Sequence, residues 1–270
     1  MFDVPDWATR HDFKNTSHSW MPTDTEELYD FNIKSNKWNT ILTNKGYTKT
    51  SISYDYNTYG FRSPEFNDVG NNIITIGCSF TEGIGLHNDE IWGSVISKEL
   101  DVPNYNLGSG GHGFFYCINM LKIWIPLLRP KYVFCLVPHP YRQGAIGPFY
   151  HNNEYHLQIH SSSFEDLANQ SELRTKLIVT ERSKSSYSAW FKNLIHCPTE
   201  NIQALVEMNS NQLDHLGNKY SVPIYYSSFT ENGLPYEDFL EDDWDWARDC
   251  SHVGSNYHKQ FAGAMLEKIK

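Results

Sequence analysis

The sequence predicts an α/β protein, specifically a flavodoxin-like three-layer αβα sandwich with a mainly parallel sheet. From residue 71 onward, short apolar runs alternate with stretches of helical periodicity, and the first three runs end at turns that contain Gly or Pro. Buried parallel strands have such continuous apolar runs, and strands that alternate with helices form a sheet covered on both faces. Ligands in these folds bind beyond the carboxyl ends of the strands, so a site is expected in the turns that follow them.

Four segments are the strand candidates. The first, with the sequence IITI at residues 73–76, is β-branched and ends at Gly77, as a buried parallel strand should. The other three lie at residues 105–107, 132–137 and 222–226.

Helices are expected between these strands and after the last one. Asn88 is expected to cap a helix that ends before Pro103. Residues 114–128 are apolar nearly all round, which is typical of a buried helix. A further helix is expected at about residues 199–219, and Ser255 is expected to cap the last one.

The texture of the chain changes near residue 70. Residues 1–70 are polar and interrupted by Asn, Ser, Thr and Pro, so an irregular N-terminal extension packed on the main domain is expected. The main domain would span residues 71–270. It would contain an insertion at about residues 141–198, where no clear periodicity is found.

Composition argues against several classes of function. The 270-residue chain has a formal net charge of -10, and an acidic surface repels phosphate backbones, so no nucleic-acid partner is expected. The sequence shows no run of about 18 apolar residues and no basic segment leading into an apolar run at its start, so no membrane association and no secretory signal are expected. A cytoplasmic location is the default expectation, and the oligomeric state is not indicated.

No metal or cofactor is expected either. The five cysteines are odd in number and show no CxxC spacing, which favours reduced thiols over a disulfide framework or a zinc site. His151, His156 and His160 do not form a complete pattern of metal ligands, so a polar loop is the better interpretation.

The turn after the first strand, residues 77–83 with the sequence GCSFTEG, is the first candidate for chemistry. A serine in a glycine-flanked turn just past a buried strand has an exposed hydroxyl, but it needs a base to become a nucleophile. The alternatives for Ser79 are an ordinary serine-containing turn or a phosphate-binding glycine loop. A P-loop would need Gly-Lys-Ser/Thr, and no Lys is present.

The loop before the last helix is the second candidate. In residues 249–258 (DCSHVGSNYH), Asp249 and His252 stand three residues apart. A catalytic histidine needs an orienting carboxylate on its other ring nitrogen, and one rigid turn can supply both groups. The alternative is a helix-entry loop whose histidine is merely hydrogen-bonded.

The glycine-rich residues 108–113 (GSGGHG) follow the second strand and are the third candidate. Glycines allow backbone N–H groups to approach an oxyanion closely. The alternative is a tight turn from strand to helix.

In this order, the three segments resemble the blocks of the SGNH/GDSL hydrolase family of serine esterases. GCSFTEG resembles the first block, which carries the nucleophile, and DCSHVGSNYH resembles the fifth, which carries an Asp and a His. NLGSGGHG resembles the second block, whose oxyanion-binding glycine matches Gly111. The resemblance covers about residues 71–270 apart from the insertion, and NTYGFRSPEF at residues 57–66 resembles a segment that precedes the domain in some members.

This resemblance implies the SGNH hydrolase fold and a specific site. The triad would be Ser79, His252 and Asp249, with the backbone N–H groups of Ser79 and Gly111 as oxyanion donors. No metal and no organic cofactor would be required.

Two positions depart from the family pattern. Cys78 stands where the first block usually has Asp. The third block normally contains Gly-x-Asn-Asp, whose Asn is an oxyanion donor, but residues 138–142 read PHPYR. Proline has no N–H to donate. His139 or Arg142 is therefore the candidate replacement for the missing donor.

Cys78 is also an alternative nucleophile, because a thiolate could attack the same substrates. It would need a lowered pKa and a nearby base. Adjacent residues on a turn point in different directions, so only one of them can face His252, and Ser79 is favoured.

The predicted function is hydrolysis of a small acyl ester, for example an O-acetyl group on a carbohydrate, through an acyl-enzyme. The partner would be a small-molecule or glycan ester. One alternative is an acyltransferase that uses the same site. The other is a catalytically weak glycan-binding module of the SGNH fold, which the missing third-block Asn and the aromatic content of 15% would suit.

Overall fold

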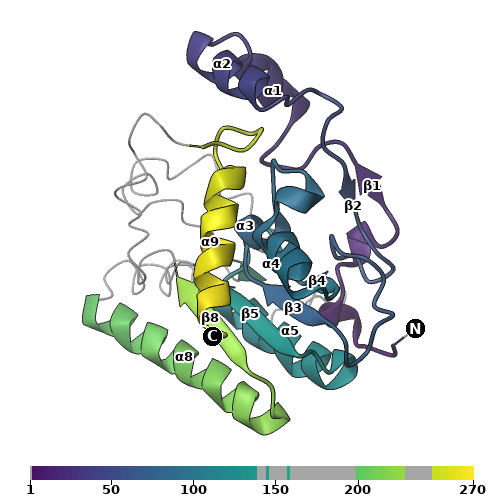
Figure 1. Ribbon diagram of the computed structural model, residues 1–270, viewed down its shortest axis with the longest axis vertical. Helices are drawn as coiled ribbons and strands as arrows, with labels where there is room; N and C mark the ends of the chain where they lie inside the picture. The colour runs from purple at the N-terminus through teal and green to yellow at the C-terminus, as the bar shows by residue number, and fades with distance from the viewer. Residues whose placement is uncertain (1, 139–143, 146–156, 159–198, 229–244) are drawn as a thin grey trace, which may run out of the picture.

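The computed structural model describes residues 2–138, 144–145, 157–158, 199–228 and 245–270 (Figure 1). Four parallel strands form its main sheet: β3 (Ile73–Ile76), β4 (Asn104–Asn106), β5 (Tyr132–Val137) and β8 (Ile224–Ser228). Their spatial order is β4-β3-β5-β8, so β3, the first of the four in the chain, lies between β4 and β5. This is the strand order of flavodoxin-like folds.

Two pairs of helices cover the two faces of this sheet (Figure 1). On one face, α4 (Trp92–Leu100) packs against α9 (Ser255–Glu267), and on the other α5 (Phe114–Leu128) packs against α8 (Thr199–Tyr220). The predicted fold class, a three-layer αβα sandwich with a parallel sheet, is therefore confirmed.

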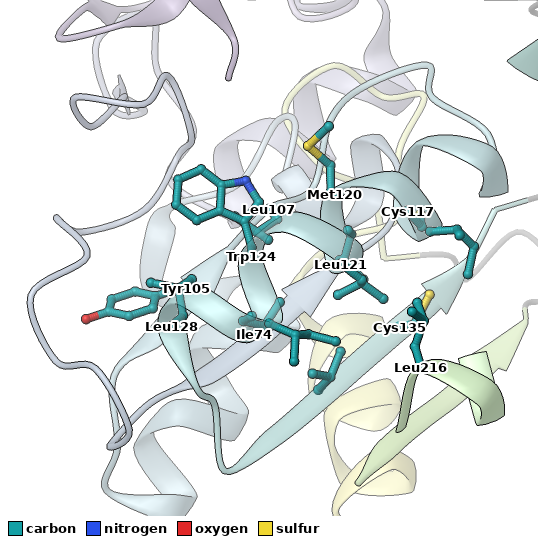
Figure 2. Close-up of a cluster of buried hydrophobic side chains, with 14 of the residues drawn as sticks. Ile74, Tyr105, Leu107, Cys117, Met120, Leu121, Trp124, Leu128, Cys135 and Leu216 are labelled. Atoms are coloured by element: carbon teal, nitrogen blue, oxygen red, sulfur yellow. The ribbon is translucent and has the colours of Figure 1, made fainter. Parts of the chain in front are cut away.

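The core follows from the alternation of side chains along each strand. In β5, Cys135 is buried in the hydrophobic cluster beneath α5 and α8, whereas Phe134 and Leu136 are buried in the cluster beneath α4 and α9. Figure 2 shows the first of these clusters, where Trp124 and Leu121 of α5 meet side chains from the strands and Leu216 of α8. Both faces of the sheet are thus buried, which explains why its central strands β3 and β5 are continuous apolar runs in the sequence.

The last strand begins two residues later than predicted. Pro223 has no N–H for the ladder, and the Val222 N–H donates to the Gly217 carbonyl near the end of α8 at 3.0 Å. Regular pairing with β5 therefore starts at Ile224, opposite Val133.

The two predicted caps were wrong. Asn88 lies inside a short 3-10 helix, η3 (Asn88–Glu90), which closes when the Glu90 carboxylate accepts the His87 N–H at 3.0 Å. The helix α4 then begins at Trp92. Ser255 is the first residue of α9, and Gly254 is its N-cap. The carboxylate of Asp245 accepts the N–H of Asn256 at 2.5 Å, in place of a serine hydroxyl.

The N-terminal residues contain more regular structure than the predicted irregular extension. Its helices are η1 (Asp6–Ala8), η2 (His11–Phe13), α1 (Glu26–Asn32) and α2 (Asn36–Asn44), and its strands β1 (Ser17–His18) and β2 (Tyr54–Asp55) pair in antiparallel fashion. Trp124 joins this segment to the main domain, because its indole N–H donates to the Ala8 carbonyl at 3.1 Å and its ring packs edge-on against Tyr59 and Phe66. The boundary at residue 70 stays a prediction.

Most of the predicted insertion at residues 141–198 lies outside the described residues. Within it, β6 (Gly144–Ala145) and β7 (Leu157–Gln158) pair in antiparallel fashion. No helix in the described ranges has both the length and the apolar composition that a membrane crossing requires.

A buried histidine of α9, His258, accepts a hydrogen bond from the start of α4. The first N–H of α4, that of Trp92, donates to Nδ1 of His258 at 3.1 Å. The imidazole is 2% exposed, and burial, with a smaller contribution from His252, lowers the pKa of His258 from 6.5 to about 3. The ring is therefore neutral in the folded protein at neutral pH, with Nδ1 as the acceptor.

Stability should consequently fall with acidification between pH 6.5 and pH 3. In that window the unfolded chain binds a proton at His258 and the folded chain does not, so the free energy of unfolding rises with pH and levels off above pH 6.5. At pH 5 the penalty should be about 2 kcal/mol. Urea denaturation of the wild type and His258→Asn at pH 7.5 and 5.0 measures it. Asn can still accept the Trp92 N–H but does not titrate, so equal acid sensitivity in the two proteins would contradict this account.

Candidate active site

The turn after β3 leads directly into the short helix α3 (Ser79–Glu82). Cys78 is its N-cap in an extended conformation, and Gly83 ends it with a φ of 80°. A Cβ at Gly77 would lie 2.7 Å from the Leu136 carbonyl oxygen of the neighbouring strand, so no larger residue fits there. This close approach places Ser79 at the carboxyl edge of the sheet, beside its central strands.

The structure brings the three predicted triad residues together. Nε2 of His252 lies 2.9 Å from Oγ of Ser79, and Nδ1 of His252 is hydrogen-bonded to Oδ2 of Asp249. The contact between His252 and Ser79 joins residues 173 positions apart in the chain. Their order is that of a nucleophile, a general base and an orienting carboxylate.

The loop that carries Asp249 and His252 is internally braced. Oδ1 of Asp249 accepts the N–H groups of Ser251 and His252 at 3.0 and 2.9 Å, which leaves Oδ2 for the imidazole. Ala247 donates its N–H to the His252 carbonyl at 2.9 Å. Asp249 is 2% exposed and His252 9%, so the pair is largely shielded from solvent.

Cys78 does not share this geometry. Among the described residues no contact joins its sulfur to His252, whose Nε2 is occupied by Ser79. Burial, and then the nearby Cys78 thiol, raise the pKa of Tyr257 in α9. The arrangement favours Ser79 over Cys78 as the nucleophile.

The glycine-rich segment packs directly against α3. A Cβ at Gly108 would lie 2.6 Å from the Glu82 nitrogen, and a Cβ at Gly110 would lie 3.7 Å from Cβ of Ser79. The N–H of Gly110 donates to Oε2 of Glu82 at 2.6 Å, and Gly111 has a φ of 79°. This turn therefore lies beside the candidate nucleophile.

Two backbone donors beside Ser79 have no acceptor among the described residues. Within the part of the chain that the structure describes, neither the Ser79 N–H nor the Gly111 N–H donates to another group. Free donors beside a nucleophile are what an oxyanion requires. His139 and Arg142, the predicted replacements for the third-block donor, lie outside the described residues.

The structure also shows a buried anchor that the sequence did not indicate. The Arg248 side chain is 0% exposed, and its Nη2 and Nε lie 2.6 and 3.0 Å from Oδ2 of Asp24. It donates further to carbonyls of Ser19 and Thr48 and lies over the ring of Trp20, 4.1 Å from the centroid. Arg248 immediately precedes Asp249, so this ion pair fixes the start of the triad loop to the N-terminal segment.

Among the described residues, no three His, Cys, Asp or Glu side chains gather in a way that could hold a metal ion. His151, His156 and His160 lie outside the described residues.

No family model and no curated protein sequence matches this chain. Solved structures that resemble it include a putative lipolytic protein of the G-D-S-L family from Desulfitobacterium hafniense DCB-2, at 10% identity and a TM-score of 0.35 over 74% of this chain and 99% of that one. A family 3 carbohydrate esterase from Clostridium thermocellum gives 12% identity and a TM-score of 0.35 over 74% and 96%. The psychrotrophic esterase EstA from Pseudoalteromonas sp. gives 10% and 0.35 over 74% and 98%.

The fold class of this chain is assigned from the strand order and the two helical layers described above.

The Arg248–Asp24 pair should contribute strongly to stability. Arg248→Met would leave the Asp24 carboxylate buried without its partner, which typically costs about 3–5 kcal/mol. Chemical denaturation measures the loss, and adding Asp24→Asn should recover part of it. The matched control is Lys49→Met, since Lys49 pairs with Glu26 and Asp30 at the surface and its loss should change little. Equal effects of the two substitutions would contradict the buried anchor.

Proposed function

We propose that this chain hydrolyses carboxylic esters through a covalent acyl-enzyme on Ser79. The observation that supports it is the bridging position of His252, with one ring nitrogen 2.9 Å from Oγ of Ser79 and the other bonded to Asp249. A serine hydroxyl is a weak nucleophile until an adjacent base accepts its proton, and this imidazole is placed to accept it.

In the first half of the reaction, Oγ of Ser79 attacks the ester carbonyl while Nε2 of His252 takes its proton. The carbonyl oxygen becomes an oxyanion, which the N–H groups of Ser79 and Gly111 would bind. Collapse of this intermediate breaks the bond to the alcohol, which leaves with the proton from His252. Asp249 stabilises the imidazolium and keeps Nδ1 protonated.

In the second half, His252 takes a proton from water, and the resulting hydroxide attacks the acyl-enzyme. The second oxyanion collapses, the acid leaves, and Ser79 recovers its proton. The proposed substrate is a small acyl ester such as an O-acetylated carbohydrate, as the sequence resemblance to SGNH hydrolases implies. If the acyl group passes to an acceptor hydroxyl instead of water, the same site acts as an acyltransferase.

Hydrolysis of p-nitrophenyl acetate and butyrate tests this proposal. Ser79→Ala should lower kcat by about 10⁴-fold or more, and Asp249→Asn by about 10⁴-fold, because the first removes the nucleophile and the second loses the required tautomer. Cys78→Ala is the matched control and should keep its activity. A fluorophosphonate probe should label the peptide that contains Ser79.

Two results would overturn the assignment. Loss of activity in Cys78→Ala with retention in Ser79→Ala would make the thiol the nucleophile. A wild type that neither hydrolyses these esters nor reacts with the fluorophosphonate would rule out the proposed chemistry.

A further inference from the structure

We propose that Glu82 is a positioning residue for the oxyanion-binding turn, and that Arg10 and Tyr56 of the N-terminal segment hold it in place. This inference rests on the proposed ester hydrolysis. It assigns a function in the site to a carboxylate outside the triad and to residues far from it in sequence.

Glu82 links three separate parts of the chain. It is the last residue of α3, three positions after Ser79, and its side chain is 1% exposed. Its Oε2 accepts the Gly110 N–H at 2.6 Å. Its Oε1 accepts Nη1 of Arg10 at 2.5 Å and the hydroxyl of Tyr56 at 2.8 Å. The carboxylate therefore ties the glycine turn to the nucleophile helix on one side and to the N-terminal segment on the other.

The bond to Gly110 determines where the next backbone donor lies. The Gly110 N–H donates to Glu82, so the N–H of the next residue, Gly111, points elsewhere. Gly111 has a φ of 79°. That is a left-handed conformation, which glycine adopts without strain. The Gly111 N–H has no acceptor within the described residues, and the turn lies beside Ser79. Glu82 thus sets the position of a free donor relative to the attacking oxygen.

A buried carboxylate at this place must be neutralised. Burial by itself would raise the pKa of Glu82, but the Arg10 guanidinium and the three hydrogen bonds outweigh it and hold the pKa below its usual value. The carboxylate is therefore ionised, and its charge is bonded to Gly110, the residue before the Gly111 N–H that would bind an oxyanion. An unpaired negative charge there would oppose the charge that develops in the transition state.

Aromatic rings and a backbone hydrogen bond hold Arg10 in place. Its guanidinium is 4.3 Å from the centroid of Phe13 and 5.3 Å from that of Tyr56, and its backbone N–H donates to the Tyr59 carbonyl at 2.9 Å. A second arginine of the N-terminal segment, Arg62, donates to the Gly83 carbonyl at 2.5 Å, at the same C-terminal end of α3. The N-terminal segment therefore holds α3 by two cations.

The test is a comparison of kcat and KM for p-nitrophenyl acetate in the wild type and in Glu82→Gln, well below the melting temperature of each. Gln keeps the shape of the side chain but loses the negative charge that all three donors bind. We expect kcat to fall about 10- to 100-fold, since the donor is displaced rather than removed, while KM changes less than about threefold. The inhibition constant of 1,1,1-trifluorobutan-2-one, which forms a hemiketal oxyanion on the serine, should rise by the factor by which kcat/KM falls.

Glu90→Gln is the matched control. The Glu90 carboxylate also accepts one backbone N–H, that of His87, and one tyrosine hydroxyl, that of Tyr47, but it lies in η3. Its loss should leave kcat and the inhibition constant unchanged. If Glu82→Gln fails to fold, Tyr56→Phe, which removes only one hydroxyl, takes its place and should lower kcat a few-fold.

Arg10→Met provides an independent test of the charge argument. It leaves the carboxylate of Glu82 without its cation, so kcat should fall further than in Glu82→Gln. The double variant Arg10→Met/Glu82→Gln removes that charge and should recover kcat toward the Glu82→Gln value, a non-additivity that a purely structural role would not produce.

The outcomes separate this inference from the function on which it rests. If the wild type is inactive on esters and unreactive with fluorophosphonates, the proposed function fails and this inference with it. If the wild type is active but Glu82→Gln or its Tyr56→Phe substitute keeps full kcat, or if Glu90→Gln loses as much, the positioning function alone is overturned.

Discussion

Two buried arginine–carboxylate pairs, Arg248 with Asp24 and Arg10 with Glu82, join the N-terminal segment to the turns that carry the candidate site. A charge removed from water is costly unless an opposite charge and further hydrogen bonds meet it, and in both pairs they do. Each pair has one partner before residue 70 and one beside a candidate catalytic group. The site therefore depends on the correct seating of the N-terminal segment, and loss of either partner would leave a buried charge next to the triad loop or the glycine turn.

The parallel sheet supplies the other half of the arrangement. Because β3 lies between β4 and β5, the turns that follow β3 and β4 meet at the same edge. Gly77 and Gly108 let these turns approach the neighbouring backbone more closely than any side chain would allow. The loop before α9 reaches the same edge through His252. None of these three segments makes a site alone, and the formation of the sheet brings them together.

Local patterns explain what the sequence could predict. The strands β3 and β5 could be predicted from the sequence because both of their faces are buried. The helix at residues 114–128 could be predicted because it is apolar nearly all round. The proximity of Ser79, Asp249 and His252 followed from the order of three short segments within a parallel fold. The helix α1 was missed because residues 1–70 were expected to be irregular, although its start has a recognisable pattern: Thr25 accepts the Leu28 N–H and two glutamates follow it.

Long-range partners explain what the sequence could not predict. Arg248 and Asp24 are 224 residues apart, and nothing in the local pattern of either distinguishes a buried pair from two surface charges. Glu82 lies inside the first block, yet its partners come from the glycine turn and from the N-terminal segment. The cap of α9 comes from the Asp245 side chain rather than from Ser255, because a carboxylate from a neighbouring loop can reach the helix start.

In the sequence resemblance to SGNH hydrolases, the asparagine of the third block has no counterpart in this chain, so the glycine turn matters more to the proposed site. After β5 ends at Val137, Pro138 has no N–H to offer, so the backbone at that point cannot replace the lost donor. Among the residues that the structure describes, the candidate oxyanion donors are then the Ser79 and Gly111 N–H groups, and a small displacement of either would weaken the proposed oxyanion site. Such a site requires a rigidly held glycine turn. Glu82 holds that turn to α3, which carries Ser79, so these two donors are fixed relative to each other.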